Sequence, residues 1–74
     1  MNTGIEALKR AKSLLGSEAA LAAVVGVKQP SVNHILNRGK YVPAKWCLAV
    51  ERATEGAITR HELRPDLYPT NEAA

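Results

Sequence analysis

The sequence predicts an all-α fold of five short helices, and three of its features support that fold class. Apolar residues recur at the three- and four-residue spacing of a helix surface. Capping residues and glycines separate these periodic segments. The two candidate strands, 24–25 and 41–42, are too short to build a sheet. With 74 residues, the chain is expected to form one domain over 1–69, followed by a disordered tail over 70–74.

The first helix is predicted to begin where Thr3 and Glu6 have the spacing of a capping box. Gly16 is predicted to end it, because helices commonly stop at a glycine. Between these residues, one face of the helix carries a regular apolar row, made of Ile5, Leu8, Ala11 and Leu15.

A second helix is expected over 18–25, with Ser17 as its N-cap and Gly26 closing it in the left-handed region. Its alanine-rich composition permits close packing against other helices. A third helix is expected over about 29–37. Pro30 is tolerated there because it lies in the first turn, where a missing N–H removes no bond within the helix.

Gly39 is predicted to end the third helix. A fourth helix is expected from Pro43 to about Thr54. Thr59 and Glu62 repeat the capping-box spacing and predict a short fifth helix that ends at Leu63. The fourth helix is expected to turn one apolar face to the core, made of Trp46, Val50 and Ala53.

The composition excludes several classes of protein. A single cysteine, Cys47, cannot form an internal disulfide. No segment has the roughly 20 apolar residues of a membrane span, and none resembles a signal peptide, so a cytoplasmic protein without membrane contact is expected. No zinc spacing, catalytic triad or phosphate-binding loop is present, so the chain is expected to have no metal, cofactor or enzymatic activity. Trp46 is expected in the core, and Cys47 beside it as an inert thiol.

The charge is unevenly distributed along the chain. Residues 1–18 carry a net charge of +1, residues 19–50 carry +4 without any Asp or Glu, and residues 51–74 carry −2. An acid-free basic middle is the pattern expected where a polyanion binds, although a solvated basic face would give the same pattern.

Within that basic middle, the residue spacing fits a helix-turn-helix. A small residue is needed where the helices cross, a glycine at the turn, and an apolar wedge to hold the second helix. These packing positions are Ala22, Gly26, Val27, Val32 and Ile35. Between them, a polar and non-acidic surface would project outward and suit the base edges of a major groove. Its members are Lys28, Gln29, Ser31, Asn33 and His34.

Residues 17–39, SEAALAAVVGVKQPSVNHILNRG, resemble the Cro/phage-repressor helix-turn-helix, a fold shared with lambda repressor. Most of the chain, roughly from Ser17 to Pro69, resembles the YdaS-type family of prophage-encoded, Cro-like regulators, which are often labelled antitoxins. The pieces that carry this resemblance are QPSVN, VPAKWC, VERATEG and ELRPDLYP. Two positions depart from the family: Lys28 stands where Ser, Thr or Asn is usual, and Leu48 where Pro is usual.

The resemblance implies a repressor that regulates transcription by reading double-stranded DNA with its third helix, and that lies on the bacterial nucleoid when bound. It implies a homodimer on a pseudo-palindromic operator, with a monomer or weak dimer when free. Base contacts are expected from the polar surface described above. Phosphate contacts are expected near the ends of the docked helices, from Ser17, Asn37, Arg38, Lys40 and Tyr41. For Tyr41, packing beside the third helix is an equal alternative.

Two other functions stay open. One is an antitoxin that binds a protein toxin and regulates its own promoter. The other is a small protein–protein adaptor, which would not show the steep loss of DNA affinity with salt that phosphate contacts require. The closing segment bears on this question, because its apolar residues either pack on the core, as we expect, or meet a second subunit. They are Leu63, Leu67 and Tyr68.

Lys28 yields a first testable prediction. Lysine is a poor N-cap, so we expect Lys28→Ser to raise the free energy of unfolding by about 1 kcal/mol. We also expect it to weaken operator binding, because Lys28 is predicted to reach a phosphate or a guanine edge. Chemical denaturation and a DNA titration measure the two effects. An unchanged operator affinity in a more stable variant would show that Lys28 makes no DNA contact.

Overall fold

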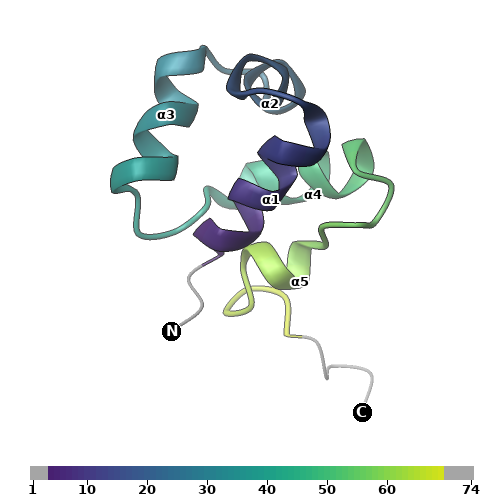
Figure 1. Cartoon of the computed structure of the whole chain (residues 1–74). Helices are drawn as coiled ribbons and strands as arrows, with labels where there is room; N and C mark the ends of the chain where they lie inside the picture. The colour runs from purple at the N-terminus through teal and green to yellow at the C-terminus, as the bar shows by residue number, and fades with distance from the viewer. Residues whose placement is uncertain (1–3, 70–74) are drawn as a thin grey trace.

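The computed structural model describes residues 4–69, and this part of the chain contains five helices and no strand. In chain order they are α1 (Ile5–Leu15), α2 (Glu18–Val25), α3 (Gln29–Arg38), α4 (Ala44–Ala53) and α5 (Arg60–Leu63) (Figure 1). The predicted all-α fold is confirmed. The expected tail over 70–74 and the expected cap Thr3 lie outside the described residues.

Local sequence signals account for most helix ends. The Ser17 hydroxyl accepts a hydrogen bond from the Ala20 amide at 3.1 Å and caps α2 as predicted. Thr59 and Glu62 form the predicted capping box at α5. The N-cap of α1, in contrast, is Gly4, which has a φ of 88° and offers no side chain for capping.

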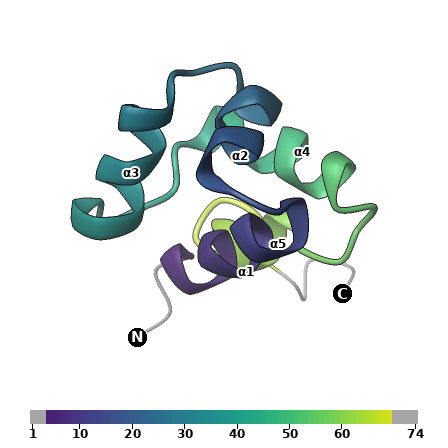
Figure 2. The same cartoon turned by 45° about the horizontal axis from the view of Figure 1, so that its top comes forward.

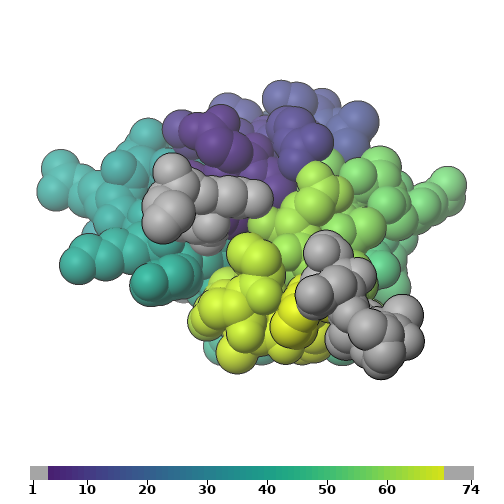
Figure 3. All heavy atoms as spheres, turned by 90° about the horizontal axis from the view of Figure 1, so that it is seen from below, coloured from purple at the N-terminus to yellow at the C-terminus, as the bar shows by residue number. Residues whose placement is uncertain are grey.

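The helices enclose one apolar core. α2 packs against α1, α3 and α4, while α5 packs against α1 and α4. Figure 2 shows α1 and α5 on one side of the molecule, with α3 set apart at its edge. Figure 3, viewed from the α5 side, shows the segment after residue 60 lying against α1. The largest fully buried side chains are Leu8, Leu21, Leu63, Val32, Val42, Val50 and Cys47.

Two sequence predictions about burial are wrong. Ala53 is exposed, because the buried face of α4 consists of Trp46, Cys47 and Val50 and its centre is therefore shifted toward Cys47, away from Ala53. Leu67 is 46% exposed, although it was expected to pack on the core. Of the closing segment, Leu63 is fully buried and Tyr68 packs against the core from its edge. This matches the expectation for those two residues.

Polar contacts hold the C-terminal segment against the helices. Arg10 of α1 binds Glu62 of α5, and this contact holds the pKa of the Glu62 carboxyl below its usual value. The Arg64 guanidinium donates to the Val42 carbonyl at 3.0 Å and to both oxygens of Asp66. These contacts join the loop before α4 to the segment after α5.

The close approach of α1 and α5 yields a prediction at Gly4. Its positive φ disfavours any other residue, and an added Cβ would collide with the backbone carbonyl of Leu63. We expect Gly4→Ala to lower the free energy of unfolding by more than about 2 kcal/mol. Gly16→Ala is the matched control, because Gly16 has a φ of 109° but open space around it. Its cost should be only the backbone strain of about 1–2 kcal/mol. If urea denaturation showed that Gly4→Ala and Gly16→Ala lose the same free energy of unfolding, a steric contact between α1 and α5 would be contradicted.

The buried thiol of Cys47 yields a further prediction. Its side chain is fully buried, and burial raises the pKa of its thiol. We therefore expect a thiol reagent such as Ellman's reagent to modify the folded protein at least about 100-fold more slowly than the unfolded chain, a ratio that needs only ~3 kcal/mol of opening free energy. Rates measured with and without denaturant test this. Equal rates would show that Cys47 is accessible and reactive.

Candidate nucleic-acid interface

The turn between α2 and α3 fixes the angle at which α3 leaves the core. Gly26 has a φ of 79°, and its amide and that of Val27 both donate to the Ala22 carbonyl, at 2.9 and 3.0 Å. Ala22 is 4% exposed and lies in the core where α2 packs. Val32 of α3 is fully buried, and Ile35 packs against the core from its edge. These contacts hold α3 with one face inward.

The opposite face of α3 is polar and open to solvent. The residues expected to face bases are all exposed, namely Lys28, Gln29, Ser31, Asn33 and His34, and so are Pro30, Asn37 and Arg38 of the same helix. Gln29 and Asn33 line a recess beside Glu18, whereas Ser31 and His34 line the side of α3 that faces α4. Lys28 occupies the N-cap position, but its ammonium only donates hydrogen bonds and cannot cap the helix; its side chain is exposed.

The cations around α3 are exposed and carry no ion pair among residues 4–69. The ion pairs of the described residues use Lys9, Arg10, Arg60 and Arg64. None uses the basic residues of the acid-free segment, which are Lys28, Arg38, Lys40 and Lys45. Lys12 and Arg52 also carry no ion pair among these residues, so what marks the surface near α3 is the absence of acidic residues from 19 to 50.

Three of the expected phosphate-contact residues already make contacts within the protein. Ser17 caps α2, and its hydroxyl proton remains available to a further acceptor. Asn37 donates from Nδ2 to the Asn33 carbonyl at 2.9 Å, which leaves its Oδ1 and one N–H unused. Tyr41 is 58% exposed, with the Arg64 guanidinium 5.3 Å from the centre of its ring. Its ring therefore packs against a residue of the segment after α5, and its phosphate contact stays a prediction.

One residue of this surface was missed by the sequence reasoning. Glu18, the first residue of α2, places its carboxylate oxygens 3.3 and 3.4 Å from Nδ2 of Asn33. The two residues are 15 positions apart, and Glu18 lies directly before the acid-free segment 19–50. The sequence offered one signal that Glu18 belongs to this surface. It follows the N-cap of α2, and a helix-turn-helix directs that end of the helix toward DNA.

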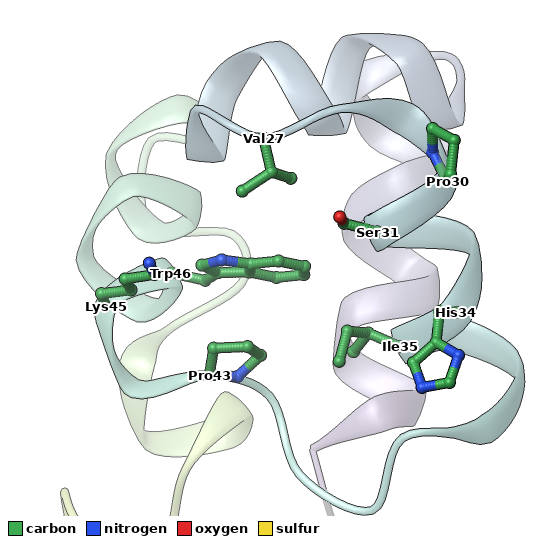
Figure 4. A pocket seen from close by; sticks show the side chains of 8 residues that line it. All are labelled: Val27, Pro30, Ser31, His34, Ile35, Pro43, Lys45 and Trp46. Carbon is green, nitrogen blue, oxygen red and sulfur yellow. The ribbon is translucent and has the colours of Figure 1, made fainter.

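A shallow apolar groove of about 450 Å³ separates α3 from α4. Figure 4 shows Trp46 between Val27 above and Pro43 below, with Ile35 of α3 facing it. Trp46 is only 3% exposed, so it belongs to the core and is not displayed for stacking on a base. This confirms the interpretation of Trp46 as a core residue.

Neither a metal site nor a membrane-spanning helix is found within residues 4–69. No group of three or more His, Cys, Asp or Glu side chains there could hold a metal ion. None of the described helices has the length and apolar character to cross a bilayer.

Comparison with known proteins identifies the family. The model of a family described as "Bacterial toxin YdaS" matches residues 8–72. Over 59 residues, the chain is 42% identical to "Putative transcriptional regulator YdaS" of Escherichia coli (strain K12). That match covers 80% of this chain and 60% of the relative, so the chain spans less than two thirds of that protein's length.

A solved structure extends the match to three dimensions. The Cro protein from "putative prophage element Xfaso 1" in Xylella fastidiosa strain Ann-1 superposes with a TM-score of 0.73 at 44% identity. The superposition covers 92% of this chain and 97% of the Cro protein. The turn geometry between α2 and α3 thus belongs to a Cro-like helix-turn-helix fold, and the chain is a member of the YdaS family.

Proposed function

We propose that this chain is a sequence-specific regulator of transcription that binds double-stranded DNA through α3. The observation that carries the proposal is the exposed polar face of α3, bordered by cations without ion pairs. The relatives support it, since one is named as a transcriptional regulator and the other as a Cro protein. Neither name describes an enzyme.

In this proposal, α3 enters the major groove and its polar side chains read base edges. Gln29 and Asn33 have carboxamides, which pair bidentately with adenine, while Lys28 favours guanine. Ser31 and His34 discriminate less. The phosphate contacts come from the residues at the ends of α2 and α3 and in the loop that follows, namely Ser17, Asn37, Arg38, Lys40 and Tyr41.

The proposed regulatory mechanism is repression by blocking polymerase. Two copies on a pseudo-palindromic operator would place their α3 helices about one DNA turn, roughly 34 Å, apart. We propose residues 1–69 as the single DNA-binding domain. An operator on the bacterial chromosome would place the protein in the cytoplasm, at the nucleoid.

A role in a toxin–antitoxin pair is the second candidate, favoured by the description of the matching family as a bacterial toxin. As an antitoxin, the chain would bind a protein toxin directly and use DNA binding to regulate its own promoter. Co-elution of the chain with the product of a neighbouring gene in size-exclusion chromatography would support that role. Growth arrest by the chain expressed alone would point instead to a toxin.

Selection of bound duplexes from a random pool tests the DNA-binding proposal. We expect wild-type protein to enrich a short inverted repeat, and the double variant Gln29→Ala/Asn33→Ala to bind that repeat about 100-fold more weakly, because each bidentate contact contributes ~1–3 kcal/mol. Ser13→Ala is the control, since Ser13 is an exposed helical residue on α1. It should leave the selected motif unchanged. If the double variant selected the same motif and bound it equally well, the proposal that α3 reads the bases would be contradicted.

A further inference from the structure

The contact between Glu18 and Asn33 places a negative charge inside a surface proposed to meet DNA. Glu18 is half-buried at the start of α2, and Asn33 is exposed in the middle of α3. Their side chains border a recess of about 380 Å³, together with Gln29 and Pro30. The carboxylate therefore lies within the row of amides expected to read bases.

The chemistry of this contact fixes which way the Asn33 carboxamide points. An ionised carboxylate only accepts hydrogen bonds, so the Asn33 atom that faces Glu18 must be the donor Nδ2. Rotating the amide by half a turn would bring Oδ1 against the Glu18 oxygens, where two acceptors repel each other. Glu18 thus excludes one of the two amide orientations.

The orientation that remains suits one base. Nδ2 carries two hydrogens, so after one is donated to Glu18 the other remains available alongside Oδ1. One donor beside one acceptor is complementary to the N7 and N6 atoms of adenine. Guanine presents two acceptors at the same edge, and Oδ1 has no partner there.

The negative charge of Glu18 lowers the binding affinity for any DNA sequence. Non-specific binding depends almost entirely on attraction between cations and phosphates, so a carboxylate at this surface weakens it. A residue that weakens binding to every sequence and fixes the contact to one base increases the difference between specific and non-specific affinity.

We propose that Glu18 is a specificity-determining positioning residue: it holds the Asn33 carboxamide in the orientation that reads adenine and lowers the affinity for other sequences. This inference rests on the proposed DNA-binding function of α3. It assigns to α2 a part in base selection without any contact between Glu18 and a base.

Glu18→Gln is the variant that tests the inference, because glutamine keeps the size of the side chain but both donates and accepts. We expect the preference for adenine over guanine at the base read by Asn33 to fall at least about fivefold. That base is identified as the position whose preference disappears in Asn33→Ala. Affinity for an unrelated duplex should rise about two- to threefold, because one repelling charge is removed.

Glu6→Gln is the matched control. Glu6 also lies in the first turn of a helix, on α1, where it is exposed and pairs with Lys9. Its substitution changes the net charge equally, so it should leave both the base preference and the Asn33 side-chain signals unchanged. In DNA-free protein, NMR spectra of the Asn33 side-chain amide should shift in Glu18→Gln and not in Glu6→Gln.

The outcomes separate this inference from the function on which it rests. Glu18→Gln could instead select the same motif as the wild type and bind every sequence more tightly by the same factor. That result would show that Glu18 acts only through its charge, and it would overturn this inference but not the DNA-binding function. A wild-type chain with no sequence preference would overturn both, even if the NMR shift confirmed the contact. Loss of the adenine preference in Glu18→Gln, with retention in Glu6→Gln, supports the inference.

Discussion

The packing of α2 against α3 is the constraint on which the rest of the structure depends. Every side chain expected to read bases lies on α3 or at its N-cap, so the angle of that helix decides what reaches the DNA. Ala22 sets this angle in two ways: its small side chain lies in the core, and its carbonyl accepts both amides of the turn. A larger residue at position 22 would separate the helix axes and move the whole polar surface together.

The fold was predictable wherever the signal was local. The caps at Ser17 and Thr59 depend on residues three positions away, so the sequence alone identifies them. Burial was less predictable, because it depends on which segment covers a helix face. Ala53 has the spacing of a core residue and is exposed, because the buried face of α4 includes Cys47 and is centred away from Ala53. Leu67 is apolar and exposed in the turn after α5, where no helical spacing was available to predict its burial.

The candidate site shows the same division. Helical spacing was enough to place Gln29 and Asn33 on the outer face of α3, and the absence of acidic residues from 19 to 50 pointed to a basic surface. The contact from Glu18 to Asn33 was beyond such reasoning, because it depends on how two helices cross. Whether these residues contact DNA stays a prediction.

The dependence of α5 on α1 has a consequence for synthesis of the protein. Helices of four residues are not stable alone, so α5 forms only when Leu63 is buried and Glu62 meets Arg10. On the ribosome, α3 emerges before those contacts exist, and a nascent chain carries its cations on a flexible backbone. A message that ended before Ile58 would therefore yield α1 to α4 without the buried side chains of Ile58 and Leu63, and Arg10 without its partner Glu62.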